Sequence, residues 1–216
     1  MDGDMADLPG LVETCKRHGA YLMVDEAHSL GVLGKTGRGI AEHFGMDEDL
    51  IDIKMGTLSK TIPAAGGYVA GSKTMTSYLK HEGRAFIYSA ALPPPSAAAA
   101  LEALAVIDDE AWRVEKLQRN YRVFADALRA KGFDLLRTEA AIVPINCDDV
   151  VTAWEVAREC QRNGVYVQAV VPPVVPMGTA RLRACVSAAH TDEEIQTCVS
   201  VIEQAGRKYG LIPDAL

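Results

Sequence analysis

The chain has 216 residues, of which 49% are hydrophobic and 24% charged, enough apolar material for one large domain or two small ones. Its net charge of −7 and its scattered basic residues argue against a nucleic-acid-binding surface, which usually carries a basic stripe. The sequence contains no apolar run long enough to cross a bilayer, so we expect no stable membrane anchor in this chain.

The first part of the chain alternates helical and strand-like stretches. A helix is expected at residues 4–18, with Asp7 and Pro9 near its beginning and Gly19 past its end. A glycine-rich loop follows the first strand. The alternation predicts an α/β sheet that is parallel at least in part. The expected strands are residues 21–24, 51–55 and 66–71.

From residue 96 onward the pattern changes. Residues 96–131 favour helix almost continuously, with a possible bend at Asp108 and Asp109, and Gly132 ends this stretch. The pattern predicts a small α+β unit attached through a long helix, with domains at residues 1–108 and 109–216. Strands are expected at residues 141–146, 165–171 and 181–187, and helices at residues 152–163 and 192–209.

The five cysteines are odd in number and never spaced as C-x-x-C, which argues against a disulfide scaffold or a structural metal site. We therefore predict no metal, and we expect buried or half-buried thiols in the reducing environment of a cytoplasm. These residues are Cys15, Cys147, Cys160, Cys185 and Cys198.

Two short motifs each close an apolar run, and the first is spelled like the acidic box of a nucleic-acid helicase. Such a box needs an upstream phosphate loop of the form G-x-x-x-x-G-K-[ST]. The nearest match, residues 29–36, has Ser29 in place of the first glycine and directly follows the acids, so we reject this interpretation. The motifs are Val24-Asp25-Glu26-Ala27-His28 and Gly56-Thr57-Leu58-Ser59-Lys60.

The same residues suit pyridoxal phosphate (PLP). Asp25, His28 and Lys60 follow strands, and open α/β sheets bind ligands beyond the carboxyl ends of their strands. PLP needs a lysine for its aldehyde and a carboxylate that keeps its ring nitrogen protonated, so that the ring can accept electrons from a carbanion. A histidine at position 28 can bind the phenolic oxygen of the ring, and Thr57 and Ser59 offer hydroxyls to the phosphate.

Each of these residues also has an ordinary structural explanation. Lys60 is one of 22 basic residues, most of which are expected to be solvated surface groups. Asp25 can cap the loop that follows it, and His28 can be a structural imidazole. The arrangement of all three at successive strand ends is what favours chemistry.

The motifs together resemble the α-oxoamine synthase family of fold-type I PLP enzymes. This family includes 8-amino-7-oxononanoate synthase, glycine C-acetyltransferase, 5-aminolevulinate synthase and serine palmitoyltransferase. The resemblance runs through nearly the whole chain. It rests on the two motifs above, the glycines and arginine of residues 31–39, Gly66-Gly67-Tyr68, residues 88–94, residues 178–183 and residues 187–191.

The resemblance implies a fold and a set of roles. The fold is α/β: the C-terminal part of a fold-type I PLP-dependent transferase large domain, followed by a small α+β C-terminal domain. The resemblance also implies that Ser89 reaches the phosphate of a partner subunit, and hence a homodimer. The other implied roles are Lys60 on the cofactor aldehyde, Asp25 on the ring nitrogen, His28 on the phenolic oxygen, Thr57 on the phosphate and Arg183 on the substrate carboxylate.

Arg183 has an alternative of its own. Arg181 stands two residues earlier on the same expected strand and points to the same face, so the pattern alone does not choose between them. A guanidinium group suits a carboxylate because its planar fork can donate two parallel hydrogen bonds. The resemblance selects Arg183.

The resemblance covers only the C-terminal portion of the family, whose members are roughly twice as long. The N-terminal arm, the glycine-rich phosphate turn and the residue that stacks on the pyridine ring have no counterpart in this sequence. We therefore expect a truncated chain whose binding of PLP is severely weakened, and the sequence does not decide whether this chain is active alone.

For the intact enzyme, the resemblance implies decarboxylative condensation of an amino acid with an acyl thioester to give an α-aminoketone. The thioester is either an acyl-CoA or an acyl carrier protein. Lys60, Asp25 and His28 are the expected catalytic residues. Two alternatives stay open: a PLP-dependent aminotransferase or racemase on the same fold, and a non-catalytic fragment of the family.

Overall fold

The computed structural model describes residues 1–213, and its parts form two compact units. The first unit comprises residues 6–115, and the second comprises residues 1–5 with the chain from Lys116 onward. The predicted division into domains at residues 108 and 109 stays a prediction, and residues 214–216 of its second domain lie outside the described part.

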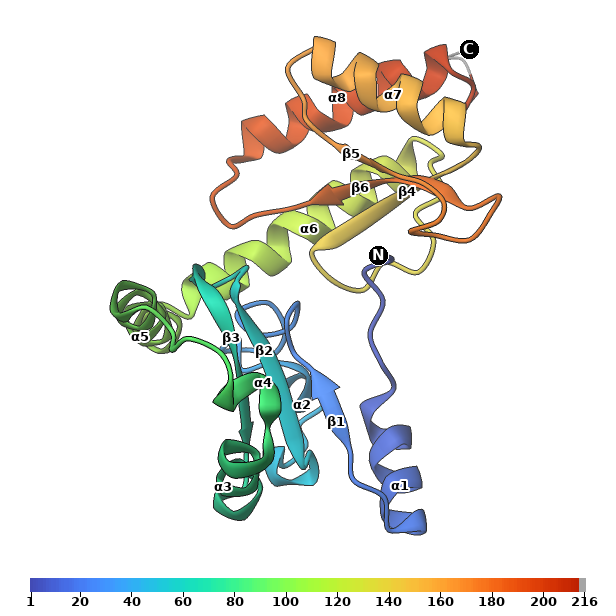
Figure 1. Ribbon diagram of the computed structural model, residues 1–216. Coiled ribbons are helices and arrows are strands. Elements are labelled where there is room, and N and C mark those ends of the chain that lie inside the picture. Colours follow the sequence, from blue (N-terminus) through green and yellow to red (C-terminus); the bar gives the residue numbers. More distant parts are fainter. Residues whose placement is uncertain (214–216) are drawn as a thin grey trace. The chain divides into compact units, whose positions relative to one another are not determined.

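The first unit is built on a mixed three-stranded sheet (Figure 1). Strands β1 (Met23–Asp25) and β2 (Ile53–Ser59) are parallel, as expected, and Asp25 pairs with Met55. Strand β3 (Pro63–Gly71) returns antiparallel to β2, because the connection of residues 60–62 is too short for a parallel crossover. The helices of this unit are α1 (Leu8–His18), α2 (Ile40–His43), the 3₁₀ helix η1 (Glu48–Leu50), α3 (Lys73–Glu82), α4 (Arg84–Ile87) and α5 (Pro94–Asp109).

The two faces of this sheet differ in how they are covered. On one face, Leu58, Ile62 and Ala100 of α5 form a small buried core, against which Tyr68 packs. On the other face, Met23 is 56% exposed and Val69 is 44% exposed. Asp25 lies on this second face, because side chains two residues apart on a strand point the same way. Asp25, at the end of β1, is therefore accessible.

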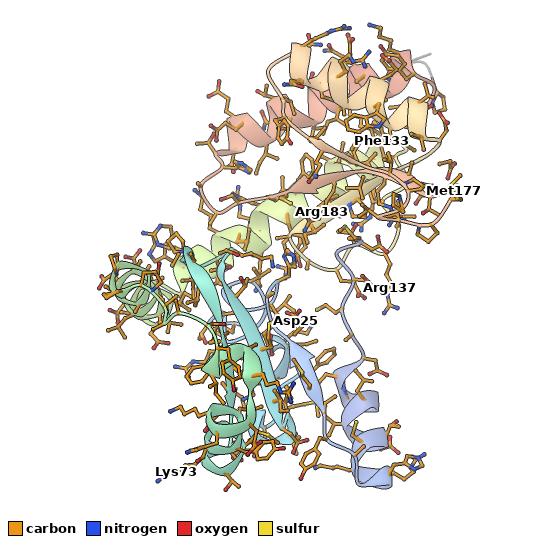
Figure 2. All side chains as sticks on the ribbon, viewed as in Figure 1. Asp25, Lys73, Phe133, Arg137, Met177 and Arg183 are labelled. Atoms are coloured by element: carbon orange, nitrogen blue, oxygen red, sulfur yellow. The ribbon has the colours of Figure 1, made fainter. Side chains whose placement is uncertain are left out.

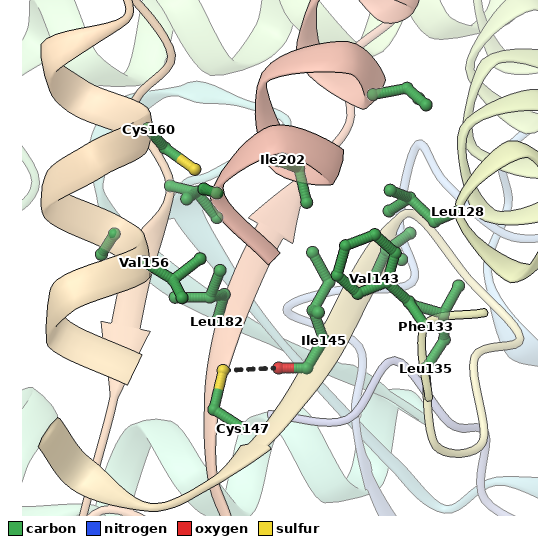
Figure 3. Close-up of a cluster of buried hydrophobic side chains, with 14 of the residues drawn as sticks. Leu128, Phe133, Leu135, Val143, Ile145, Cys147, Val156, Cys160, Leu182 and Ile202 are labelled. Carbon is green, nitrogen blue, oxygen red and sulfur yellow. Dashed lines mark hydrogen bonds between the residues drawn. The ribbon is translucent and has the colours of Figure 1, made fainter. Parts of the chain in front are cut away.

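The second unit has an antiparallel sheet in the order β4-β6-β5. Its core lies between this sheet and its helices, and Figure 3 shows Val143, Ile145 and Leu182, each 0% exposed, at its centre. The strands are β4 (Ile142–Asp148), β5 (Gln168–Val170) and β6 (Ala180–Cys185). The helices are α6 (Trp112–Ala130), which begins in the first unit, α7 (Val150–Arg162) and α8 (Asp192–Lys208).

Several predicted boundaries are wrong by a few residues, each for a local reason. The first helix begins at Leu8, because the side chain of Asp7 accepts a hydrogen bond from the Gly10 amide and so caps the helix there. The long helix at residues 96–131 is two helices, which separate beside the expected bend at Asp109. The strand expected at residues 165–171 shortens to β5. Within residues 1–213, no helix combines the length and the apolarity that a membrane crossing needs.

The expectation for the cysteines is wrong at one position. Cys147 and Cys160 are buried and Cys15 and Cys198 are half-buried, but Cys185 is exposed at the end of β6. Burial raises the pKa of the Cys147 thiol to about 12 and that of Cys160 to about 11, which removes the reactive thiolate at neutral pH.

We expect iodoacetamide at pH 8 to alkylate Cys185 in the native protein long before it alkylates Cys147 or Cys160. The reason is that only a thiolate attacks, and the buried thiols are neither ionised nor accessible at that pH. Peptide mass spectrometry over a time course measures the order. Equal alkylation of Cys147 and Cys185 in the folded protein would contradict the expectation.

Candidate functional site

Asp25 is the last residue of β1, and its carboxylate is exposed (Figure 2). Its Oδ1 accepts a hydrogen bond of 2.8 Å from the Ala27 amide, so the side chain does cap the turn that follows the strand. This contact holds the carboxylate in one orientation at the carboxyl end of β1. The capping interpretation and the ligand-binding interpretation are therefore compatible, because the group remains open to solvent.

His28 lies on a tight turn directly after β1. The amides of Ser29 and Leu30 both donate to the Glu26 carbonyl, each at 3.1 Å, and these bonds fold residues 26–30 into a compact turn. The imidazole is exposed. The turn thus presents His28 close in sequence to Asp25 and on the accessible side of a fixed backbone.

Lys60 follows β2 at the tip of the β2–β3 hairpin, and its side chain is exposed. The Thr57 Oγ1 lies 2.9 Å from the Ser59 Oγ and 3.3 Å from the Gly66 carbonyl oxygen, at a point where the strand pairing shifts register. Ile62, 1% exposed, anchors the hairpin tip in the core. Two hydroxyls therefore lie together on the hairpin whose tip carries Lys60.

The segments that carry His28 and Lys60 touch through Gly31. This glycine has φ +73°, and a Cβ built on it would lie 2.2 Å from the Cγ2 of Thr61, the neighbour of Lys60. Only a glycine permits this approach. This contact and the pairing of Asp25 with Met55 show that the segments that carry the two motifs are neighbours. The roles assigned to these residues stay predictions.

Sequence reasoning missed two carboxylates that organise the glycine-rich loop. Glu26, 6% exposed, accepts hydrogen bonds from the Ser29 hydroxyl and from the Ile40 amide. Glu42 accepts from the amides of Thr36 and Arg38, each at 2.9 Å. Burial alone would raise the pKa of Glu42, but these hydrogen bonds outweigh it and lower the pKa below its ordinary value. In the sequence, the four glycines of this loop were the signal that its backbone follows a tight, irregular path.

In the second unit, Arg181 and Arg183 lie on one face of β6, as their spacing predicts. Arg181 is 5% exposed, pairs with Asp2, and donates from Nε to the Thr179 carbonyl at 3.0 Å. Burial lowers its pKa. The Nε of Arg183 is also buried but has no hydrogen-bond partner among residues 1–213. Arg181 is therefore engaged in structure, while Arg183 (Figure 2) retains donor capacity.

Replacing Asp2 by alanine is expected to lower the free energy of unfolding of the second unit by about 1–3 kcal/mol, because it leaves the buried Arg181 guanidinium without its partner. Urea unfolding followed through Trp154, in a background where Trp112 is phenylalanine, reports on this unit. Asp4→Ala is the matched control. An unfolding midpoint for Asp2→Ala equal to that of the control would contradict the expectation.

Ser89 is not brought to the other predicted phosphate ligands. It follows α4, is exposed, and donates from Oγ to the Ala85 carbonyl. Within residues 1–213, no hydrogen bond joins it to Thr57 or Ser59. This placement leaves the hydroxyl on the surface of the first unit.

The chain resembles several known proteins over nearly its whole length. It is 42% identical over 212 residues to 8-amino-7-oxononanoate synthase from Symbiobacterium thermophilum, a match that covers 98% of this chain and 54% of that protein. The Sphingomonas wittichii serine palmitoyltransferase structure matches with a TM-score of 0.93 at 32% identity, covering 99% of this chain and 54% of that chain. A structure of 8-amino-7-oxononanoate synthase from Francisella tularensis matches with a TM-score of 0.84 at 28% identity, covering 98% and 61%.

These comparisons confirm the resemblance to the α-oxoamine synthases and the fold class expected from it, a part of a fold-type I PLP-dependent enzyme. The chain spans about half the length of the curated relatives it matches. The family model for aminotransferase class I and II matches residues 1–202. The chain therefore belongs to the aminotransferase class I and II family.

Proposed function

We propose that this chain contributes the catalytic lysine segment and the small domain of a PLP-dependent acyltransferase. The enzyme condenses an amino acid with an acyl thioester, either acyl-CoA or acyl carrier protein, and releases carbon dioxide and a free thiol. The observation that supports the proposal is that β1 and β2 are neighbouring parallel strands, with Asp25 at the end of β1 and Lys60 directly after β2. The similarity to 8-amino-7-oxononanoate synthases and serine palmitoyltransferases supports the choice of reaction.

The residues fit PLP in their chemistry and accessibility. Asp25 offers an oriented, exposed carboxylate for the ring nitrogen, and Lys60 offers an exposed amine for the aldehyde. Thr57 and Ser59 place two hydroxyl oxygens 2.9 Å apart on the hairpin that carries Lys60, and hydroxyl groups can donate hydrogen bonds to a phosphate. A serine palmitoyltransferase structure that is 34% identical to this chain, a lysine-to-alanine variant from S. paucimobilis, holds a PLP–myriocin aldimine. The cofactor supplies an electron sink for the carbanion formed from the amino acid.

Each protein group has a defined task in this reaction. The Lys60 amine removes the proton from the α-carbon of the amino acid. The Asp25 carboxylate holds the proton on the ring nitrogen, and the His28 imidazole binds the phenolic oxygen and polarises the acyl carbonyl. The Arg183 guanidinium binds the carboxylate until it leaves, and its unpartnered Nε supports its choice over Arg181.

The proposal includes a homodimer, in which Ser89 binds the phosphate held by the partner subunit. An exposed apolar segment surrounds Ser89: Phe86 is 67% exposed and Tyr88 is 84% exposed. Apolar side chains in such a group favour burial against another protein surface. We also place the enzyme in the cytoplasm, where the five free thiols would stay reduced.

The experiment that tests the proposed reaction is product analysis. The full-length protein is supplied with PLP, a carboxyl-labelled amino acid and either acyl-CoA or acyl carrier protein, and labelled carbon dioxide and free thiol are measured together. The proposal predicts equal amounts of both. The family also contains aminotransferases by name, and that alternative predicts an oxo acid without carbon dioxide. A fragment without catalytic activity would give neither.

A further inference from the structure

The buried carboxylate of Glu26 lies in sequence between two exposed site residues. Asp25 and His28 both face solvent, whereas Glu26 is 6% exposed. Carboxylates are rarely buried unless they are paired or hydrogen-bonded. Within residues 1–213, no lysine or arginine forms an ion pair with Glu26. Its burial therefore depends on hydrogen bonds.

Those hydrogen bonds join three separate segments. The Glu26 amide donates to the Met55 carbonyl at 2.7 Å, which ties it to β2 beside the pairing partner of Asp25. Its Oε2 accepts from the Ser29 hydroxyl in the turn that carries His28. The same Oε2 accepts from the Ile40 amide at 3.2 Å, where the glycine-rich loop ends. One residue thus fixes the backbone on both sides of the proposed cofactor ligands.

The backbone of the glycine-rich loop passes close to this carboxylate. A Cβ on Gly39, whose φ is +99°, would lie 2.6 Å from Glu26 Oε2, so the loop passes as close as a glycine allows. Burial and then the charge of Glu26 raise the pKa of Tyr68, whose ring lies against Gly56 at the start of the hairpin that carries Lys60. The glycine-rich loop and the Tyr68 hydroxyl therefore lie near the buried Glu26 carboxylate.

We propose that Glu26 is a positioning residue. It holds Asp25 and His28 in register with the Lys60 hairpin, and these residues then bind the cofactor. The inference rests on the proposed function, because it assumes that these three residues bind PLP. Glu26 touches neither cofactor nor substrate, and it acts through the hydrogen bonds to Ser29 and Ile40. The carboxylate's role is that of a double acceptor.

The test compares Glu26→Ala, Glu26→Gln and the matched control Glu42→Ala in the full-length protein. Glu42 also accepts loop amides, but at Thr36 and Arg38, away from the motifs. We expect Glu26→Ala to weaken PLP binding about tenfold or more, because two hydrogen bonds to a charged group are lost. Glu26→Gln is expected to restore affinity to within about threefold, because its amide oxygen still accepts both hydrogen bonds. Glu42→Ala is expected to bind PLP as the unaltered protein does.

Amide hydrogen exchange supplies a second readout that is independent of the cofactor. Glu26→Ala is expected to accelerate exchange at Ile40, and Glu42→Ala to accelerate it at Thr36 and Arg38 only. Faster exchange at Ile40 with unchanged PLP affinity would overturn the proposal. An equal loss of affinity for PLP in Glu26→Ala and Glu42→Ala would also overturn the proposal. If the unaltered protein binds no PLP through Lys60, the proposed function fails. The exchange data still test whether the Glu26 carboxylate holds the Ile40 amide.

Discussion

Replacing Lys60 by alanine is expected to lower the condensation rate of the full-length enzyme by roughly 10²–10⁴-fold or more, the range for loss of a positioned base. Lys60 is exposed and directly follows Ser59, whose hydroxyl lies 2.9 Å from that of Thr57. The neighbouring residues Ser59 and Thr61 carry no amine that could replace that of Lys60. Single-turnover measurement of carbon dioxide release reports the rate.

Lys35→Ala is the matched control for this change, because Lys35 is an exposed lysine in the loop of the same unit. It is expected to leave the rate unchanged. Retention of full activity in Lys60→Ala would remove the lysine from the mechanism. A comparable loss in Lys35→Ala would show that the effect is not specific to position 60.

Replacing Arg183 by lysine is expected to raise the KM for the amino acid about 10- to 100-fold, with a smaller change in kcat. The substitution keeps the positive charge but removes the planar fork that donates two parallel hydrogen bonds to a carboxylate. Steady-state kinetics at varied amino acid and saturating thioester separate the two parameters.

Arg137→Lys is the control, because Arg137 is an exposed arginine of the same unit that pairs with Glu139 at 3.2 Å. Its kinetics are expected to match those of the unaltered enzyme. An unchanged KM in Arg183→Lys would contradict the role of Arg183, and Arg181 would then need to be considered despite its pairing with Asp2.

Sequence patterns predicted those parts of the fold that depend on local chemistry. The apolar runs before Asp25 and Ser59 marked β1 and β2, and Gly19 marked the end of α1. Helix α3 went unpredicted: its only apolar stripe, Met75, Tyr78 and Leu79, spans a little over one turn, and none of its residues is buried. Helix α4 is only four residues long, which is below the length at which periodicity can be seen.

Parts of the candidate site were beyond local sequence reasoning because they depend on distant partners. Strand alternation placed Arg181 and Arg183 on one face, but the engagement of Arg181 depends on Asp2, 179 positions away. The residues next to Glu26 in sequence do not indicate that its side chain is buried, because its partner Ile40 is 14 residues further along the chain. The motifs marked the ends of β1 and β2, and the structure added the hydrogen bonds of Glu26 to Ser29 and Ile40 beside them.

The central claim is that Asp25, His28 and Lys60 form one PLP site, and covalent mapping tests it most directly. The full-length protein is incubated with PLP and reduced with borohydride, which fixes a lysine-bound pyridoxal as a stable secondary amine. Proteolysis and mass spectrometry then locate the modified residue. We predict stoichiometric modification of Lys60 in the unaltered protein. In Asp25→Ala, a smaller fraction of Lys60 is expected to be modified. Modification spread over surface lysines, with no preference for Lys60, would contradict the account.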